Sequence, residues 1–484
     1  LVEFSNYVPF DELSLIFASE VVSSASSMMG HIFFKAEGVN VNSNVVTHSL
    51  AYFTEISTIN PFKLIYESTY AGMGGFFSVR PFDRDLSKYL QEEQRNLWEY
   101  KLTASKQELR LFQLHLWELK GLDIKYLFQS YNCATMTLEL LALLEPEILS
   151  KRTSIVTPVD VVKATIDSKL VSNTQVEVSD LWLYHLIRDE LSTEQMAFAS
   201  ELLDKSVPLG ETDIEPTVRA FLDISLKQGS TDLPNKRKQE LRQYIDSYEK
   251  PSFNILENKR PELTPQDSAL DVRYYWGGDT AHSLSKLKVG YLAAGHFLSG
   301  DNRQYLSESQ LALGYAAVAY DFSNKELTLD ELTVYSVKSL VADTAAYPAF
   351  SSEIYVGYRP VWQSHTKEKS VFEVSGGLGK TYKLHKDIGV YWLAGGGGAA
   401  TFSHSQLFAK FTAGLTVNAL YNTKILADYR YDSGRAKKGG EQQSINLSLN
   451  WFPDTNGFFS ISVSSLMLDN DRSTNIALQV VNYF

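Results

Sequence analysis

The single cysteine of the chain, Cys133, is the residue with the most distinctive chemistry. It follows Asn132 and directly precedes an apolar run with helical spacing, so we expect it at the N-terminus of a helix. The dipole and free backbone N–H groups of a helix N-terminus favour a thiolate and can also hold an oxyanion. One hypothesis is therefore a nucleophilic thiolate, and the alternative is an inert, buried cysteine.

Two upstream histidines are candidate bases for this thiol. His31 follows a glycine and begins the predicted strand 32–35, while His48 lies in the next predicted strand, Val45–Ile56. A cysteine at a helix end that faces a histidine on an adjacent strand is the arrangement of cysteine hydrolases. The chain contains nine histidines, so spacing alone does not separate the catalytic interpretation from a structural cysteine.

Three zones follow one another along the chain. Residues 1–150 mix strand patterns with predicted helices at Asp83–Tyr100, Ser105–Lys120 and Cys133–Leu144. Residues 151–265 are polar and helical and end in a proline-containing linker. The residue pattern changes again over residues 266–484, which predicts a third domain there.

Alternating polar and apolar residues characterise this third zone. About twelve period-2 segments follow one another between clusters of Asn, Asp, Gly, Ser and Lys, with no predicted helix among them. An even number of such strands is typical of an antiparallel β-barrel in a bacterial outer membrane. The final Phe484 shares a face with Leu478 and Val480, which resembles the C-terminal signal that the barrel assembly machinery reads in Gram-negative outer-membrane proteins. A soluble β-sandwich or barrel is the alternative.

Composition restricts the function classes further. The net charge of −12 argues against nucleic acid as a partner. No apolar run approaches the ~18 residues of a spanning helix, and the mean hydropathy of −0.17 suits alternating barrel strands. His115 and Glu118 lie three residues apart, but no HExxH pattern or Cys/His cluster is present, so we expect neither a metal nor a cofactor. The chain begins at Leu1 rather than Met, as expected after removal of a signal peptide.

The stretch from about Ser26 to Pro146 resembles the periplasmic N-terminal domain of the Lnb-type family, named for a lipoprotein intramolecular acyltransferase. The blocks that carry the resemblance are Gly30–Phe34, His48–Tyr52, Gly72–Phe77, Arg80–Phe82, Arg95–Tyr100, Leu114–Leu119 and Asn132-Cys133. This family is similar to circularly permuted NlpC/P60 papain relatives, which implies an α+β papain-like fold for residues 1–150. Ala134 and Thr135 depart from the more polar or aromatic pair expected after the cysteine.

The resemblance also implies roles for individual residues. Cys133 matches the nucleophile and His31 the general base, with His48 as the candidate orienting residue. Asn132 is expected either to cap the helix or to contribute to an oxyanion site. Candidate substrate contacts are Arg80, Tyr52 and Tyr126, although a structural ion pair is the stronger expectation for Arg80.

The implied reaction is acyl transfer or hydrolysis through a thioester, with acyl groups of outer-membrane lipids or lipoproteins as cargo. With an even number of strands, the first strand begins and the last strand ends on the same side of the membrane. We therefore expect the N-terminal domain in the periplasm, with the barrel as its anchor. Two alternatives remain: a peptidoglycan amidase or endopeptidase with the same dyad, and a non-enzymatic barrel that acts as channel or scaffold.

Overall fold

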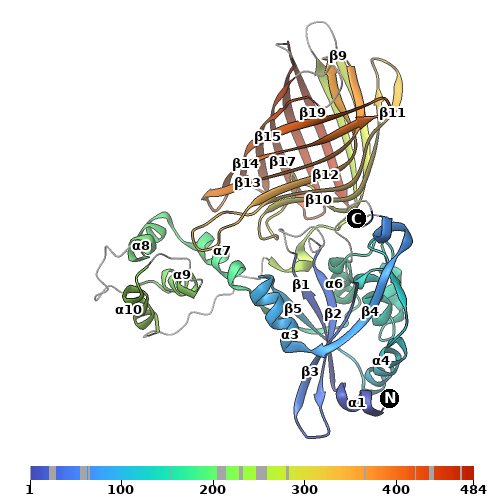
Figure 1. The fold of residues 1–484 in the computed structure, drawn as a ribbon, viewed down its shortest axis with the longest axis vertical. Helices are drawn as coiled ribbons and strands as arrows, with labels where there is room; N and C mark the ends of the chain where they lie inside the picture. The colour runs from blue at the N-terminus through green and yellow to red at the C-terminus, as the bar shows by residue number, and fades with distance from the viewer. Residues whose placement is uncertain are drawn as a thin grey trace. The chain divides into compact units, whose positions relative to one another are not determined.

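A computed structural model describes residues 2–20, 29–54, 63, 66–153, 155–203, 214–227, 233–246, 259–278, 283–364, 367–419, 421–434, 441–468 and 471–484. These residues form two compact units, Leu1–Trp182 and Leu183–Phe484 (Figure 1). The first unit therefore extends past residue 150, because a strand near residue 174 belongs to its sheet. Each unit is described by itself.

An antiparallel sheet in the order β6-β4-β3-β2-β1-β5-β7 organises the first unit (Figure 1). Its strands are β1 (Glu12–Ala18), β2 (His31–Val39), β3 (Val45–Thr54), β4 (Met73–Pro81), β5 (Leu97–Leu102), β6 (Ile124–Tyr126) and β7 (Val171–Glu177). Six of the seven residues of β1 are buried, as expected for a strand covered on both faces.

Helices pack on both faces of this sheet. They are α1 (Val2–Tyr7), η2 (Glu67–Ala71), α3 (Phe82–Ser87), η3 (Lys88–Glu92), α4 (Lys106–Leu119), α5 (Cys133–Leu141), η4 (Pro146–Lys151) and α6 (Pro158–Asp167). Because side chains alternate along a strand, Phe34 of β2 contacts Phe112 of α4, with ring centroids 4.9 Å apart. Phe33 points to the other face and stacks on Tyr89 of η3 at 5.8 Å.

The predicted helices at 105–120 and 133–144 are confirmed as α4 and α5. Ser105 caps α4 in a capping box with Glu108, which fixes where the helix begins. The prediction of one helix over residues 83–100 is wrong in its second half. There the chain forms β5, whose residues pair with β1 on one side and β7 on the other.

A group of helices follows, and the boundary between the two units, after Trp182, falls within the first of them. They are α7 (Asp180–Glu190), α8 (Thr193–Leu203), α9 (Pro216–Lys227) and α10 (Asn235–Asp246), followed by the short η6 (Pro261–Leu263). Consecutive members α8, α9 and α10 contact one another. Among the described residues, no helix is long and apolar enough to cross a membrane.

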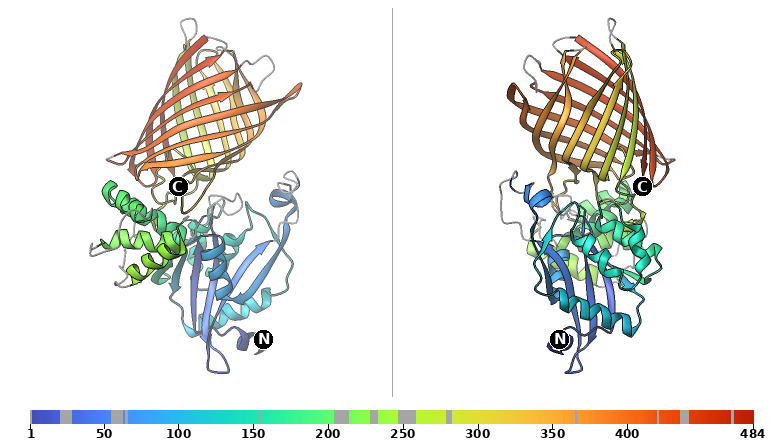
Figure 2. Two further views of the ribbon diagram at one scale, coloured as in Figure 1. Left: turned by 60° about the vertical axis from the view of Figure 1, so that its left-hand side comes forward. Right: turned by 90° about the vertical axis from the view of Figure 1, so that its right-hand side faces the viewer.

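Twelve strands close into an antiparallel barrel, in which β19 pairs with β8 (Figure 2). They are β8 (Ala269–Gly278), β9 (Ser283–His296), β10 (Glu308–Asp321), β11 (Glu326–Leu340), β12 (Ser351–Ser364), β13 (Lys367–His385), β14 (Ile388–Thr401), β15 (His404–Ala419), β16 (Thr423–Asp432), β17 (Gln442–Asp454), β18 (Gly457–Leu468) and β19 (Asp471–Tyr483). The prediction of about twelve strands is confirmed. With an even strand number, β8 begins and β19 ends at one rim, which we call the terminal rim.

The outer surface of the barrel is apolar. In β17, Ile445, Leu447, Leu449 and Trp451 are all exposed, whereas Asn450 between them is buried in the interior. Phe484 continues the outward row of Leu478 and Val480. This alternation matches the pattern expected of a strand with one face toward lipid and one toward the lumen.

Charged side chains pair across the barrel interior. Lys410 of β15 lies 2.8 Å from the carboxylate of Glu353 on β12, three strands away, and Glu353 also pairs with Lys338 at 3.4 Å. The Lys410–Glu353 pair therefore spans the lumen, whereas Lys338 and Glu353 are directly opposed on the neighbouring strands β11 and β12. Around them, a cavity of about 170 Å³ remains.

The segment 297–307 between β9 and β10 folds into the terminal rim. The buried amine of Lys424, on β16, donates to the carbonyls of Leu298 at 3.1 Å and Gly300 at 2.6 Å. In the closed strand order, β16 lies six strands from β10, on the opposite side of the barrel. Phe297 in turn packs on Tyr483, whose hydroxyl accepts the Phe297 N–H at 3.1 Å. The segment thus crosses the barrel mouth and is fastened on both sides.

Candidate active site

Cys133 is the first residue of α5, as the sequence predicts, and is buried. Asn132 caps the helix by accepting the Thr135 N–H at 3.0 Å. Its amide nitrogen donates to the carbonyls of Phe128 at 2.9 Å and Val156 at 3.0 Å. Both amide protons are therefore used, so the geometry favours the capping role for Asn132 over the oxyanion role.

Polar groups converge on Cys133 despite its burial. Its backbone N–H donates to the hydroxyl of Tyr126 at 3.4 Å. Burial raises the pKa of the Cys133 thiol, while hydrogen bonding from the Ile32 N–H, the Tyr126 hydroxyl and the Ala134 N–H opposes this rise. The sulfur thus lies among three donors that favour its thiolate form.

The sheet opens at the point where α5 begins. Strands β2 and β3 pair from Val39/Val45 up to Phe34/Leu50, but no pairing continues beyond that point, although β2 extends back to His31. Helix α5 contacts both strands. This divergence frees the Ile32 N–H from the β-ladder, so that it faces the thiol instead.

His31 lies at this same end of β2. The N–H that faces the sulfur belongs to the peptide bond joining His31 to Ile32, so the structure brings His31 and Cys133 to one end of the sheet. The imidazole is half-buried and stacks on Phe33 at 5.8 Å. Gly30 precedes it with a φ of +81°, where an added Cβ would come within 2.5 Å of the Phe17 ring.

Burial lowers the pKa of His31 to about 3, with further lowering by the positive charges of Arg95, Lys88 and Arg80. His31 is therefore neutral at neutral pH, which is the form that can accept a proton.

Arg95 is a residue of this site that reasoning from residue types did not single out. Its buried guanidinium donates to the carbonyls of Ser19 at 2.5 Å and Ala18 at 2.8 Å and lies 5.0 Å from the Tyr89 ring centroid. Ala18 is the β1 partner of His31. The charge of Arg95 lowers the pKa of both His31 and Cys133. The one sequence feature that pointed to Arg95 was its place in the block Arg95–Tyr100, which carries part of the family resemblance.

His48 does not join this site. It pairs with Ala36, five residues along β2 from His31, which corresponds to roughly 16 Å of strand. Its ring instead packs edge-on against Tyr7 at 4.7 Å, and burial lowers its pKa. The structure therefore places the peptide bond between His31 and Ile32 next to Cys133, whereas His48 lies farther along the sheet.

Of the three candidate substrate contacts, the two tyrosines lie beside Cys133 and Arg80 does not. Tyr52 stacks on Tyr126 at 5.5 Å and donates to the Ile124 carbonyl at 3.2 Å, which places both tyrosines beside Cys133. Arg80 instead forms a bidentate ion pair with buried Asp85, with its Nε donating at 2.9 Å. Arg80 is thus held in the structural ion pair that the sequence favoured. Within the described part of the chain, no group of three His, Cys, Asp or Glu residues could hold a metal.

The pKa values predict how Cys133 reacts with an alkylating agent. Because burial raises the thiol pKa, the thiolate fraction is small at neutral pH and continues to grow as the pH rises through the alkaline range. We expect iodoacetamide labelling of Cys133, measured by intact mass between about pH 6 and pH 10, to accelerate with pH and to show no plateau near neutral pH. Fast, pH-independent labelling at neutral pH would instead indicate a thiolate–imidazolium pair and contradict this arrangement.

The closed barrel with an apolar exterior and the α/β domain that precedes it define the class: an outer-membrane β-barrel protein with a separate N-terminal domain. Residues 2–168 match the family described as the Lnb N-terminal periplasmic domain, so this part of the chain is a domain of that type. Residues 263–483 match a domain of unknown function, DUF7840. The chain is thus located in the outer membrane, with its N-terminal domain in the periplasm.

Solved structures similar to the chain include outer-membrane channels. The KdgM porin is 13% identical with a TM-score of 0.27, covering 45% of this chain and 99% of its own. An outer membrane channel from Pseudomonas putida F1 is 10% identical with a TM-score of 0.31, covering 46% and 96%. The NanC porin is 8% identical with a TM-score of 0.29, covering 44% and 99%. No curated protein matches the chain significantly.

Proposed function

We propose that the periplasmic domain is a thiol acyltransferase or hydrolase that carries acyl groups of lipids or lipoproteins as a thioester on Cys133. The observation that carries the proposal is the position of Cys133: it begins α5, and its sulfur faces the peptide N–H that follows His31 and the hydroxyl of Tyr126. Acyl transfer requires a nucleophile, oxyanion donors and a base, and His31, which adjoins the N–H facing the sulfur, is the proposed base.

In the proposed reaction, His31 accepts the thiol proton as the sulfur of Cys133 attacks the carbonyl carbon of an ester. The resulting oxyanion is stabilised by donors beside the sulfur. The N–H of Cys133 already donates to Tyr126, so the tyrosine hydroxyl keeps its own proton to donate. Collapse of the tetrahedral intermediate breaks the ester C–O bond, and protonated His31 returns the proton to the leaving alcohol.

The second half of the reaction releases the acyl group. An amine or a water molecule attacks the thioester carbonyl and His31 takes the proton from the nucleophile; the C–S bond then breaks, and the leaving thiolate of Cys133 recovers the proton from His31. With an amine as acceptor the product is an amide, as on a lipoprotein N-terminus, and with water it is a free fatty acid.

The surroundings of Cys133 support an acyl chain as cargo over a peptidoglycan peptide. Tyr126 packs against Tyr52 at 5.5 Å and against Phe128 at 5.3 Å, and Tyr131 lies 6.4 Å from Tyr52. Such an aromatic cluster offers apolar contact area rather than the charged groups that a peptide stem would require. The membrane anchor keeps the domain near lipids and lipoproteins, which are its proposed partners, with peptidoglycan as the competing one.

The barrel interior supports an anchoring role over a channel. Segment 297–307 crosses the terminal rim and is held by Lys424, and the Lys410–Glu353 pair spans the lumen above it. We also propose that the outer-membrane assembly machinery inserts this barrel, because the outward-facing residues of its strands are apolar.

The direct test is to trap the acyl-enzyme. After incubation of the full chain with a phospholipid of defined acyl chains, intact-mass spectrometry is expected to show one added acyl group on Cys133. Neutral hydroxylamine should remove that mass, because it cleaves thioesters but spares amides. A peptidoglycan fragment that modifies or is cleaved by the protein, without any acyl adduct from lipid, would favour the amidase alternative.

A further inference from the structure

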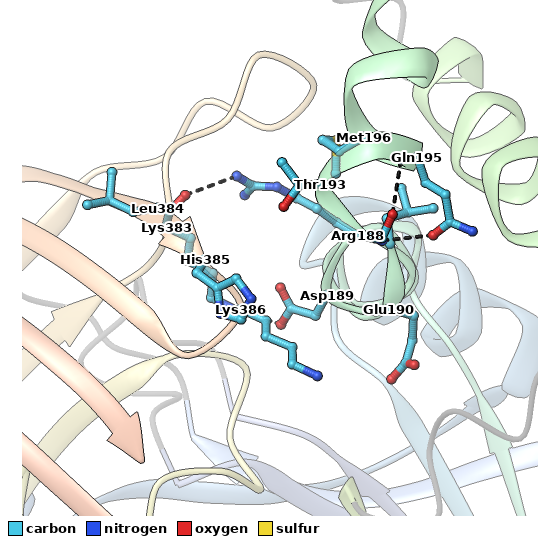
Figure 3. A pocket seen from close by; sticks show the side chains of 12 residues that line it. Arg188, Asp189, Glu190, Thr193, Gln195, Met196, Lys383, Leu384, His385 and Lys386 are labelled. Carbon is cyan, nitrogen blue, oxygen red and sulfur yellow. Dashed lines mark hydrogen bonds and ion pairs between the residues drawn. The ribbon is translucent and has the colours of Figure 1, made fainter. Parts of the chain in front are cut away.

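A pocket of about 430 Å³ lies within the second unit, between the end of α7, the start of α8 and the β13–β14 turn (Figure 3). The proposed reaction at Cys133 makes no use of it. Its charged lining comes from Arg188, Asp189, Glu190, Lys383 and Lys386, and Leu384 adds an apolar edge. Basic residues thus enter the pocket from both a helix and a barrel turn.

The charges of the pocket are not balanced internally. Lys383 is neutralised by Asp189 at 2.6 Å. Arg188 donates weakly to the Lys383 carbonyl through Nη2 at 3.5 Å, while its Nη1 is buried and has no hydrogen-bond partner among the residues that the structure describes. A guanidinium N–H that is buried without an acceptor is costly, so this position favours an anionic ligand.

Two further features of the pocket, Lys386 and the N-terminus of α8, are also positively charged. The side chain of Lys386 is exposed at the turn, and it forms no ion pair with any described residue. Helix α8 begins in the pocket, where Ser192 and Gln195 cap it reciprocally at 2.7 and 3.2 Å, so its positive N-terminal dipole faces the same space. Figure 3 shows the Glu190 carboxylate turned away from Arg188.

The pocket adjoins the lipid-facing surface of the barrel. Along β13, the outward row runs through Phe372, Val374, Leu378 and Tyr382 to Leu384, which is 69% exposed at the edge of the pocket. Strand β13 ends at the terminal rim, which faces the periplasm because the periplasmic domain precedes β8. The pocket therefore lies where headgroups of the inner leaflet meet the barrel.

We propose that this pocket binds the phosphate group of a membrane phospholipid, with Arg188 and Lys386 as its ligands. The Arg188 guanidinium offers its unpartnered Nη1 N–H and its charge to a phosphate oxygen, the Lys386 ammonium adds a second charge, and the acyl chains lie along the Tyr382–Leu384 row. This site stands on its own residues and does not depend on chemistry at Cys133.

The test is native mass spectrometry of the full chain in detergent, titrated with dioleoyl phosphatidylglycerol. Arg188→Gln and Lys386→Gln are each expected to raise the Kd about tenfold, since each removes one charge-assisted contact to phosphate. Lys227→Gln is the matched control, because Lys227 pairs with Asp223 on α9 outside the pocket, and its Kd should stay at the wild-type value. Heat-modifiable migration on gels checks that each barrel is folded, and the exposed Lys386 can be changed without disturbing the interior.

Two competitors identify the source of the ligand. Neither inorganic phosphate nor dioleoylglycerol, which lacks the phosphate, should displace bound dioleoyl phosphatidylglycerol. Displacement by inorganic phosphate would assign the pocket to a free anion, and displacement by dioleoylglycerol would reduce it to an apolar contact. Either result, or unchanged lipid binding in both pocket variants, would overturn the proposal.

Discussion

Cells in which Cys133 is replaced by alanine are expected to lose the acyl-transfer product completely. Removing a nucleophile costs an enzyme at least about 10³-fold in rate, because no other group can form the covalent intermediate. Cys133 is the only cysteine of the chain, so no second thiol can substitute. The measurement is mass spectrometry of lipoprotein N-termini together with lysophospholipids, compared with the wild type and a gene deletion.

Cys133→Ser provides the second variant for this test. The hydroxyl nearly preserves the size of the buried thiol and can be held by the same donors at Ile32 and Tyr126, so folding is retained while the nucleophile is lost. Limited proteolysis of the periplasmic domain confirms that it is intact. If lipoprotein N-termini and lysophospholipids are the same in wild type, both variants and the deletion, the acyl-transfer proposal fails.

The barrel could be predicted from the sequence because its strand pairings join segments that are adjacent in the sequence. Each strand pairs with its neighbour along the chain, except for the closing pair β8–β19, and the period-2 pattern directly shows which side chains face lipid. The alternation of Ile445, Leu447 and Leu449 is therefore sufficient to orient β17. The closure of the rim could not be predicted, since the contact from Lys424 to Gly300 joins positions more than a hundred residues apart.

The periplasmic domain was harder because its pairings are long-range. Residues 97–102 carry apolar residues at spacings that also fit a helix, and only the pairing with β1 and β7 makes them a strand. The placement of Cys133 at a helix start succeeded for the opposite reason, since Asn132 and the following apolar run are adjacent in sequence.

The misplacement of His48 has a simple geometric cause. In the β2–β3 hairpin, paired residue numbers add to 84, as for Phe34 with Leu50 (34 + 50) and Ala36 with His48 (36 + 48). On the same register His31 would lie opposite Phe53 (31 + 53), so two histidines on adjacent strands cannot meet here. The polar turn at residues 40–44 sets this register and was a readable signal.

The two histidines therefore make a matched pair for a decisive prediction. His31→Gln is expected to slow acyl transfer by about 10²- to 10⁴-fold, the usual contribution of a positioned general base. His48→Gln should leave the rate within about threefold of wild type, because roughly 16 Å of strand separates it from the thiol. Single-turnover formation of the acyl-enzyme measures both.

The same pair separates a base from a structural residue. His48 is buried against Tyr7, so His48→Gln should lower the melting temperature of the periplasmic domain while sparing the chemistry. His31→Gln should slow acylation while leaving the melting temperature close to that of the wild type. It should also shift acylation toward higher pH, because burial raises the pKa of the Cys133 thiol and the thiol proton then has no acceptor. An equal loss of rate in the two variants would show that His48 also takes part in catalysis. A fully active His31→Gln would show that His31 is not the general base.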